Sequence, residues 1–186
     1  TDYKVLILTL NENDVPPEIQ RMVADETKEI NSDDASKLIG CINALSKQIL
    51  GDDGVLQRED PNFMKRAVAF CPKITASKKI TNVFNDFAAV YTDSFRGTSA
   101  ETKGLQMVTV SSDHIDGTMS APERDGKLAW LKDETPDGEC RILTNVRCLS
   151  EGVDVPSLDA VMFLAARNSP VDVVQSVGRV MRKAPG

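Results

Sequence analysis

Two arginines near the end of the chain have a spacing that suits phosphate chemistry. Arg179, Arg182 and Gln175 fall on one face of a predicted helix, because positions three, four and seven apart share a face. A guanidinium group is a rigid, permanently charged fork that matches a phosphate. An arginine that reaches a γ-phosphate stabilises the transition state of phosphoryl transfer. Gly178 interrupts the helix at a cost of about 1 kcal/mol relative to alanine, which favours close approach of another surface. A solvated arginine face explains the spacing equally well.

A polar segment at the end of a predicted strand is a second candidate site. Thr144 and Asn145 offer short polar groups to the phosphate of a nucleic-acid backbone. Gly152 permits close approach of a backbone, and Asp154 is able to accept a hydrogen bond from a ribose hydroxyl. The alternative is a tight turn, in which the glycine supplies a positive φ, the aspartate caps locally and Pro156 ends the turn. The pattern alone favours the turn.

A third candidate site lies at the start of a predicted helix, after Pro72. Lys73 and Thr75, with two more lysines downstream, place ammonium and hydroxyl groups at the positive end of that helix. A helix start of this kind binds phosphate readily. The alternative is a capped helix with surface lysines, and the local pattern favours this alternative when no other evidence is added.

His114 is the only histidine, and it precedes a predicted turn that contains Asp116 and Gly117. Since no serine or cysteine partner is evident from the sequence, His114 is a poor candidate for a general base. We interpret it as structural in preference to substrate-contacting. The four cysteines lack C-x-x-C spacing, so no metal site is expected. Three of them lie in apolar stretches, as reduced core cysteines do, which is typical of a cytoplasmic protein.

The elements that must position these residues follow from the hydrophobic pattern. Short apolar runs alternate with amphipathic helices, which predicts an α/β fold with a doubly wound, mostly parallel sheet. Ligands of such sheets bind beyond the carboxyl ends of the strands. Ser120 has the spacing of a capping box with Glu123. The predicted strands cover residues 2–10, 66–71, 105–110, 140–144 and 159–164, the predicted helices cover 17–30, 32–50, 75–91, a stretch from 120 onward and 170–182, and residues 92–104 are predicted to form a loop.

Composition and charge limit the classes of partner. The chain has 186 residues, of which 41% are hydrophobic and 27% charged, and this suits one soluble domain with its own core. The net charge of −6 argues against a nucleic-acid partner, because phosphate contact needs a basic surface. A domain that shares its nucleic acid with a second domain needs only a local basic patch. No apolar run approaches the roughly 20 residues that span a bilayer, so no membrane partner is expected.

Taken together, these segments resemble the second, C-terminal RecA-like domain of superfamily 2 helicases, in particular the helicase or translocase motor of bacterial restriction–modification enzymes. The segments that carry the resemblance are residues 66–71 as motif IV, 114–117 with Arg124 downstream as the histidine–glycine turn and following arginine, 144–156 as motif V and 175–182 as motif VI. The resemblance implies an entry strand at 1–10, a helical insertion at 11–61 and a RecA-like domain at 62–186, truncated at its C-terminus. Both ends of the chain are then cuts within a longer polypeptide.

The resemblance also implies roles for the candidate residues. ATP and Mg²⁺ would be held mainly by the first RecA-like domain of the same polypeptide. The groups expected at the γ-phosphate are Arg179, Arg182 and Gln175, those expected near the nucleotide are Gly152, Asp154 and Gly178, and those expected on a nucleic-acid backbone are Lys73, Thr75, Thr144 and Asn145. The nucleic acid is expected to be DNA, with RNA left open. Hydrolysis would open and close the cleft between the domains and move the protein along the strand.

Two motifs of the first domain are missing from this chain. It contains no G-x-x-x-x-G-K-[ST] sequence and no DExH-type box for Mg²⁺, so we expect the isolated chain neither to bind ATP tightly nor to hydrolyse it. One alternative function is a nucleotide- or cofactor-binding α/β domain of another class, such as a transferase, although no G-x-G-x-x-G follows a predicted strand. The other is a regulatory or interaction domain that keeps the fold without the activity.

Overall fold

A four-stranded parallel sheet lies at the centre of the protein. In the computed structural model the described residues are 16–25, 30, 32–47, 54–59, 62–98, 104–146 and 158–164. The strands are β1 (Arg66–Phe70), β2 (Thr109–His114), β3 (Glu139–Asn145) and β4 (Ala160–Phe163), in the spatial order β2-β3-β1-β4. Every neighbouring pair is parallel, as predicted.

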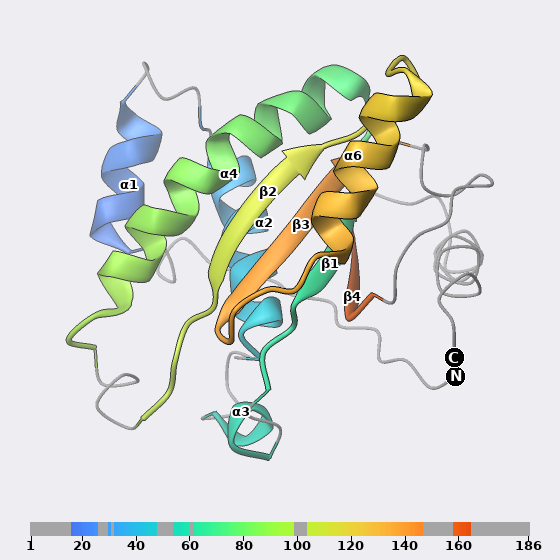
Figure 1. Cartoon of the computed structure of the whole chain (residues 1–186). Coiled ribbons are helices and arrows are strands. Elements are labelled where there is room, and N and C mark those ends of the chain that lie inside the picture. Colours follow the sequence, from blue (N-terminus) through green and yellow to red (C-terminus); the bar gives the residue numbers. More distant parts are fainter. Residues whose placement is uncertain are drawn as a thin grey trace, which may run out of the picture.

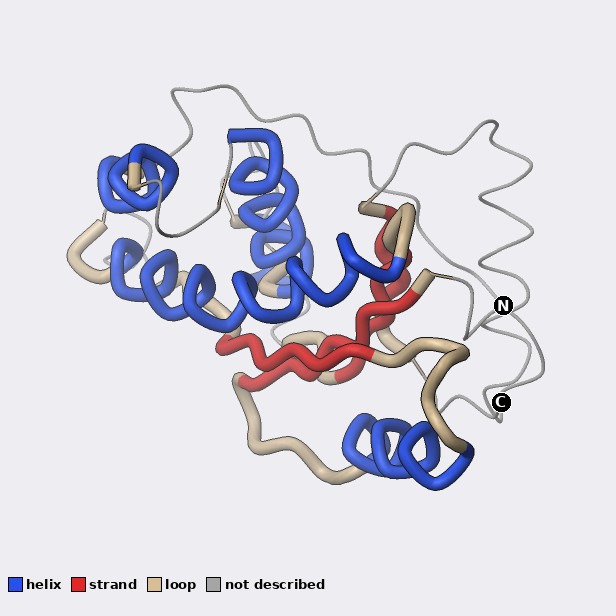
Figure 2. The backbone as a smooth tube through the Cα atoms, turned by 90° about the horizontal axis from the view of Figure 1, so that it is seen from above, coloured by secondary structure: helices blue, strands red, loops and turns tan. Residues whose placement is uncertain are grey.

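Helices cover both faces of the sheet (Figure 1, Figure 2). The described helices are α1 (Pro17–Ala24), α2 (Ser32–Leu45), α3 (Val55–Glu59), α4 (Ile74–Phe95) and α6 (Ala121–Lys132), of which α3 lies beyond the end of the sheet and not on a face (Figure 1). On one face α4 connects β1 to β2, with α1 and α2 against it, and on the other face α6 connects β2 to β3. Among the described residues, no helix has the length and hydropathy that a membrane crossing requires.

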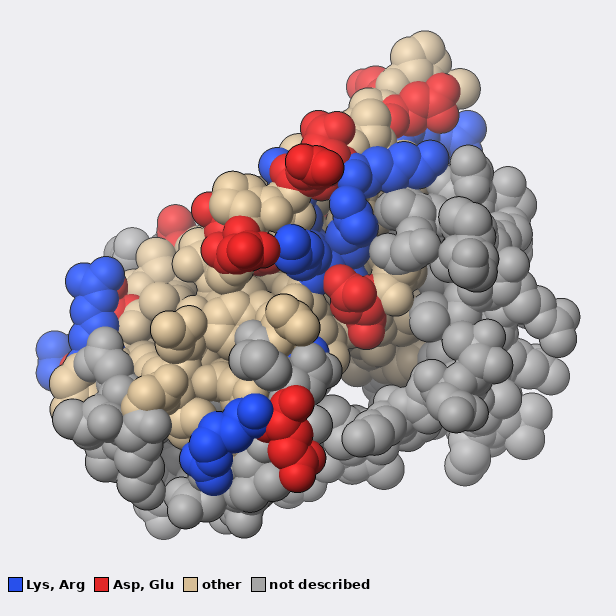
Figure 3. Space-filling view, turned by 60° about the horizontal axis from the view of Figure 1, so that its bottom comes forward, with Lys and Arg blue, Asp and Glu red and all other residues tan. Residues whose placement is uncertain are grey.

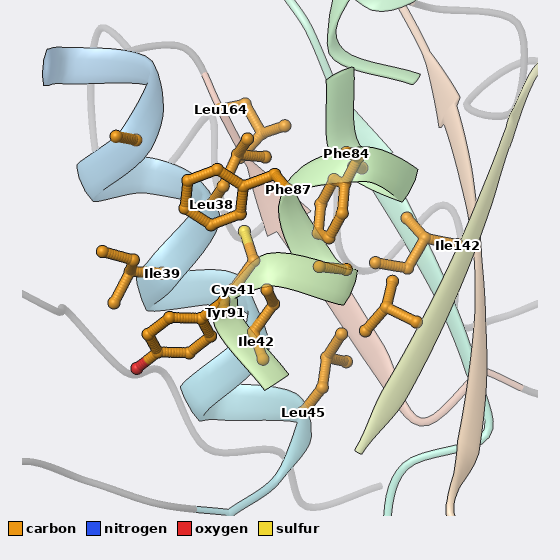
Figure 4. Close-up of a cluster of buried hydrophobic side chains, with 14 of the residues drawn as sticks. Leu38, Ile39, Cys41, Ile42, Leu45, Phe84, Phe87, Tyr91, Ile142 and Leu164 are labelled. Atoms are coloured by element: carbon orange, nitrogen blue, oxygen red, sulfur yellow. The ribbon is translucent and has the colours of Figure 1, made fainter. Parts of the chain in front are cut away.

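Two hydrophobic clusters hold the helices to the sheet, because successive side chains of a strand point to opposite faces. On the α4 face, Phe84 and Phe87 pack with Ile142 of β3 and with the buried side of α2 (Figure 4). On the α6 face, Leu128 and Leu131 pack against residues of β1 and β3. Both leucines are buried. Each fully buried side chain of this size contributes about 1.5–3 kcal/mol.

The helices that precede β1 share the first of these clusters. Leu38, Ile42 and Leu45 of α2 are fully buried on the side that meets α4. The hydroxyl of Tyr91 donates a hydrogen bond to Oδ1 of Asn43 across 2.8 Å, so a polar contact adds to the apolar packing between the two helices. The sheet and these helices therefore have one continuous core on this face.

Several helices differ from their predicted lengths. Residues 92–95 belong to α4 instead of a loop, since the packing of Tyr91 against α2 outweighs the low helix propensity of the polar residues that follow. α1 ends at Ala24 and α2 at Leu45, before the predicted ends, and Lys47 beyond α2 has a φ of 55° that a helix does not allow. The short helix α3 was not predicted.

The second strand lies further along the chain than predicted. Apolar residues indicated a strand at 105–110, but pairing with β3 begins at Thr109, opposite Glu139, and runs to His114. β2 is an edge strand with polar residues such as Ser111 exposed, so its pattern lacks the continuous apolar run of the central strand β1.

In the described part of the chain, polar side chains bond to the outer edge of β2 and of the segment before it. Gln57 of α3 donates to the carbonyl of Gln106 and accepts from its N–H, both at 2.8 Å. Asn85 of α4 makes the same pair of bonds to Ser112, at 3.2 and 2.7 Å. These contacts satisfy backbone groups that the edge of a sheet leaves unpaired. One further contact of this kind joins the N–H of Val108 to Oγ of Ser46 at 2.9 Å.

Side chains also satisfy both ends of α6. Ser120 Oγ accepts from the N–H of Glu123, whose carboxylate accepts from the N–H of Ser120 at 2.7 Å, so the predicted capping box is confirmed. At the other end, Arg66 Nε donates to the carbonyl of Leu131 at 2.9 Å. Arg141 donates to the carbonyl of the helix's tryptophan and lies 5.3 Å from the centre of its ring. Cations are favourable at a helix C-terminus.

The described cysteines lie in the core, as predicted. Cys41, Cys71 and Cys140 are buried. Burial raises the pKa of the Cys41 and Cys140 thiols to about 12, so neither is a thiolate at neutral pH. Cys148 lies outside the described residues.

Candidate nucleic-acid interface

The carboxyl ends of β1, β2 and β3 form one edge of the sheet. The N–H of Cys71, after β1, donates to the carbonyl of Asn145 at 2.7 Å, and the N–H of Ile115, after β2, donates to the carbonyl of Thr144 at 3.0 Å. The start of α4 follows Cys71 closely. The structure thus brings the predicted sites at 73–75 and at 144–145 to the same edge.

The first turn of α4 is open to solvent at this edge. Lys73 is its N-cap residue, with φ −154° and ψ 161° and no side-chain capping bond. Lys73 and Thr75 are exposed, and the Lys78 side chain is 56% exposed. The N–H groups at a helix start carry a partial positive charge, so lysines and helix end together suit a phosphate group.

Thr144 and Asn145 lie behind that surface. Both residues are 0% exposed. Oγ1 of Thr144 is 2.6 Å from Oγ1 of Thr81 and 2.9 Å from Oγ of Ser77, and Nδ2 of Asn145 donates to the carbonyl of Ala69 at 3.2 Å. Their contact with a nucleic-acid backbone stays a prediction. In this arrangement both side chains are covered by other residues, and Thr144 is bonded to Ser77 of α4.

A buried chain of polar side chains links α4 to the turn after β2. Ser77 Oγ is 2.7 Å from Nδ1 of His114, and Nε2 of His114 is 2.6 Å from Oδ2 of Asp116. Oδ1 of Asp116 accepts from the N–H of Thr118 at 2.8 Å and from the Thr118 hydroxyl. The side chains that meet here come from three segments distant in the sequence, since Thr144 of β3 continues the chain beyond Ser77.

The Asp116 carboxylate is held in its charged form. The hydrogen bond from the Thr118 hydroxyl is the largest cause, and with the bonds from His114 and the Thr118 N–H it lowers the pKa of Asp116 to about 2, against the opposing effect of burial. Nζ of Lys78 is 3.8 Å from Oδ2. An ionised carboxylate only accepts hydrogen bonds, so Nε2 of His114 carries a proton that it donates to Asp116.

Ser77, His114 and Asp116 have the residue types of a hydrolytic triad without its access. The serine of a triad must reach its substrate, but Ser77 is 0% exposed and its hydroxyl also bonds to Thr144. His114 thus has the serine partner that the sequence did not reveal, which corrects that expectation, and its burial fits the structural interpretation. Among the described residues, no group of three His, Cys, Asp or Glu side chains has metal-site geometry.

A sequence signal for the missed partners was available in α4. Ser77 and Thr81 precede Phe84 and Ala88 at helical spacing, so they extend the inward-facing stripe of the helix, and both are buried. Buried hydroxyls need hydrogen-bond partners. Two hydroxyls on the inner face of a helix therefore predict polar partners at the sheet end beneath them, and the only histidine ends the adjacent strand.

Figure 3 shows the face toward the amino ends of the strands, where Lys and Arg are interspersed with Asp and Glu. At that end Lys65 Nζ pairs with Asp137 Oδ1 at 3.1 Å, and Arg66 and Arg141 bond to the last carbonyls of α6. Among the described residues, charges of both signs are mixed on this face, whereas exposed lysines gather at the start of α4 at the opposite edge.

The remaining predicted site residues lie outside the described part of the chain. They are Gly152, Asp154, Gln175, Gly178, Arg179 and Arg182, and the strand predicted at 2–10 and the helix predicted at 170–182 lie there as well. Arg124, which the resemblance placed after the histidine–glycine turn, is described on α6. Its buried Nε has no hydrogen-bond partner among the described residues.

The chain is similar to known proteins in both sequence and fold. Residues 62–184 match the family described as helicase conserved C-terminal domain. The solved structure "ATP-dependent Type ISP restriction-modification enzyme LlaBIII bound to DNA" is 34% identical with a TM-score of 0.66, and the match covers 91% of this chain and 10% of that chain. "Probable helicase A859L" of African swine fever virus is 52% identical over 42 residues, which are 23% of this chain and 5% of the viral protein. The chain thus spans a tenth or less of these relatives, and the predicted RecA-like fold with its helical appendage is confirmed.

Proposed function

This chain belongs to the helicase conserved C-terminal domain family, and from that premise we propose that it is the C-terminal motor domain of an ATP-dependent DNA helicase or translocase within a cytoplasmic restriction–modification enzyme. The likeness to the DNA-bound, ATP-dependent Type ISP enzyme supports the proposal most directly. It covers 91% of the chain, which is more than residues 62–184 contain, so the helices before β1 share in it.

The DNA backbone binds, in this proposal, at the start of α4. Lys73, Thr75 and Lys78 are exposed there, and their ammonium and hydroxyl groups join the N–H groups of the helix start. Thr144 and Asn145 support this surface from behind, Thr144 through its bond to Ser77. This local basic surface makes DNA binding compatible with a net charge of −6, because a first RecA-like domain of the same polypeptide shares the DNA.

The nucleotide is bound between this domain and the first RecA-like domain, which supplies most contacts to ATP and Mg²⁺. From this side Arg179 and Arg182, with Gln175, face the γ-phosphate, and Gly152, Asp154 and Gly178 lie close to the nucleotide. The donor set of two guanidinium groups and one amide suits phosphate oxygens and not a metal ion. When bound, ATP supplies the free energy for movement along DNA, and the two arginines stabilise charge on the phosphate oxygens.

The test is ATP hydrolysis by the longer protein that carries this chain, with and without duplex DNA. Arg179→Ala and Arg182→Ala are each expected to lower kcat on the order of 10³-fold with ATP binding largely retained, because the lost contact is strongest in the transition state. Arg96→Ala removes an exposed arginine at the far end of α4 and is the matched control. The isolated 186-residue chain is expected to show no turnover.

Two outcomes would contradict the proposal. Full activity of the Arg179 and Arg182 variants would mean that these arginines do not contact the γ-phosphate. Absence of hydrolysis in the longer wild-type protein, with DNA or RNA, would replace the motor with a regulatory or interaction domain that has the same fold.

A further inference from the structure

The buried polar chain at the DNA-binding edge has a function of its own. We propose that His114 is a positioning residue for DNA binding: by bonding Ser77 on one side and Asp116 on the other, it holds the first turns of α4 against the turn at 116–118. The inference rests on the proposed function, because it concerns the same edge. His114 is 6% exposed, so it acts through the residues it joins and not by touching DNA.

His114 is able to join these two partners because each ring nitrogen has its own. Nε2 donates to the ionised Asp116 carboxylate at 2.6 Å. Nδ1 faces the Ser77 hydroxyl at 2.7 Å, and that hydroxyl has one proton to share between Nδ1 and Thr144 Oγ1. A neutral ring accepts the serine proton, and a charged ring donates to the serine, which then donates to Thr144. The link between α4 and the turn therefore exists in both protonation states of the histidine.

The elements joined in this way carry the groups that would meet a phosphate. Ser77 precedes the exposed Lys78 and lies one helical turn beyond Lys73. Asp116 fixes Thr118 through two hydrogen bonds, and Thr118 is exposed. With the link intact, these groups are held in one arrangement before DNA arrives, and less conformational freedom is lost on binding.

Burial makes the link strong and specific. Ser77 and Thr144 are 0% exposed and Asp116 is 2% exposed, so water does not compete for these hydrogen bonds, and the bonds are stronger than their equivalents on a surface. A group left without its partner here cannot turn to solvent. Removal of Ser77 Oγ or of the imidazole is therefore expected to shift the start of α4.

The experiment uses the longer protein and measures the concentration of linear duplex DNA that half-saturates ATP hydrolysis. Ser77→Ala removes the hydroxyl. His114→Gln replaces the ring N–H that donates to Asp116 with an amide N–H, but it loses the Ser77 contact. Each is expected to raise the half-saturating DNA concentration about tenfold, the factor that corresponds to 1.4 kcal/mol, with kcat at saturating DNA unchanged. The double variant is expected to match the single ones, because both break the same link.

Ser112→Ala is the matched control. Its buried hydroxyl donates to the carbonyl of Thr81 at 3.1 Å, so it also joins β2 to α4, but it takes no part in the chain through His114. The control is expected to lower the melting temperature without changing the DNA requirement. If the role of His114 is purely structural, then Ser77→Ala, His114→Gln and Ser112→Ala will all lower the melting temperature and leave the half-saturating DNA concentration unchanged.

A second measurement examines the link itself. His114 is the only histidine of the chain, so the ¹⁵N shifts of its ring in the 186-residue chain are assigned without ambiguity. In the neutral ring we expect the hydrogen on Nε2, which faces the Asp116 carboxylate at 2.6 Å, and a hydrogen on Nδ1 in its place would overturn the proposal. An unchanged DNA requirement in Ser77→Ala and His114→Gln would overturn it too. If DNA fails to stimulate the wild-type protein, the proposed function has failed first, and this inference fails with it.

Discussion

Asp116 is the residue at which the buried chain of hydrogen bonds ends, and its charge fixes the tautomer of His114. The carboxylate is almost fully buried, and its two oxygens accept hydrogen bonds from different residues. One receives Thr118, and the other receives His114, with the Lys78 ammonium 3.8 Å away. Three hydrogen bonds from Thr118 and His114, together with the nearby Lys78 ammonium, replace the water that the carboxylate loses on folding, so burial does not neutralise it.

Asp116→Asn is expected to lower stability at neutral pH and to reduce its loss in acid. The folded-state pKa of Asp116 is about 2, against an ordinary value of 3.8. A lowered pKa stabilises the fold above about pH 4, and this contribution of about 2 kcal/mol is lost as the pH falls toward 2. Urea titrations at about pH 7 and about pH 3 measure the free energy of unfolding. Asp137→Asn, on a side chain that is 99% exposed, is the control, and an equal acid dependence in wild type and Asp116→Asn would contradict the assignment.

Residue types and spacing predicted part of the candidate interface. The positions of Lys73 and Thr75 at a helix start followed from Pro72 and from the apolar stripe of the helix, and the structural role of His114 followed from its isolation in the sequence. The partners of His114 were not predicted, because Ser77 is 37 positions away from it and hydrophobic periodicity does not indicate which buried polar groups meet.

Among the elements, α6 depends most visibly on contacts from outside itself. It has a weak apolar stripe, in which the buried residues are Leu128 and Leu131. Its start is capped by its own sequence, but its last carbonyls are bonded by Arg66 of β1 and Arg141 of β3. The helix is thereby attached to the amino ends of two strands through charged hydrogen bonds, which are stronger than neutral ones.

Arg66→Met is expected to destabilise the fold by about 1–2 kcal/mol, because it leaves the carbonyl of Leu131 without its donor while the apolar stem is kept. The midpoint of urea unfolding should fall with no change in the slope. Arg21→Met, at an exposed arginine of α1, is the control. Equal midpoints for the two variants would show that the bond to α6 contributes nothing.

Element type was more predictable than element bounds. The capping box of α6 was predicted because both partners lie three residues apart. The prediction misplaced β2 by several residues because an edge strand needs no continuous apolar run. It missed α3 because the described contacts of this helix are the hydrogen bonds of Gln57 with residues 46 and 106. Such contacts are long-range, and a local pattern does not contain them.

For the molecule as a whole, the helices before β1 and the sheet are expected to unfold together. Ile42 of α2 is fully buried in the same cluster as Phe84, Phe87 and Ile142. The only tryptophan of the chain, Trp130, lies in the other cluster, on the opposite face of the sheet. Helix content, to which α1 and α2 contribute, and the fluorescence of Trp130 together report whether the protein unfolds as one cooperative unit.

Ile42→Ala is expected to lower the free energy of unfolding by about 3 kcal/mol, because it opens a cavity in this core. The loss should appear equally in helix content, by circular dichroism, and in Trp130 fluorescence. Ile42→Val, which removes one methylene, is the graded control with a loss of about 1 kcal/mol. A fluorescence transition that stays in place while helix content falls would mean that α1 and α2 form a separate unit.

A strand at the rim of a sheet is a template on which foreign chains assemble, and fibril growth starts from such rows of unpaired amides. Along β2 and the segment before it, an incoming strand would have to displace the carboxamides of Asn85 and Gln57, which already imitate a neighbouring strand. Asn85 belongs to α4, whose inner side is part of the core, and Gln57 is also bonded to the carbonyl of Ser46, so displacing these side chains would disturb the helices that carry them. Resistance to aggregation at this edge therefore depends on the stability of α3 and α4. A variant that loosens either helix would aggregate under conditions in which the rest of the protein is still folded.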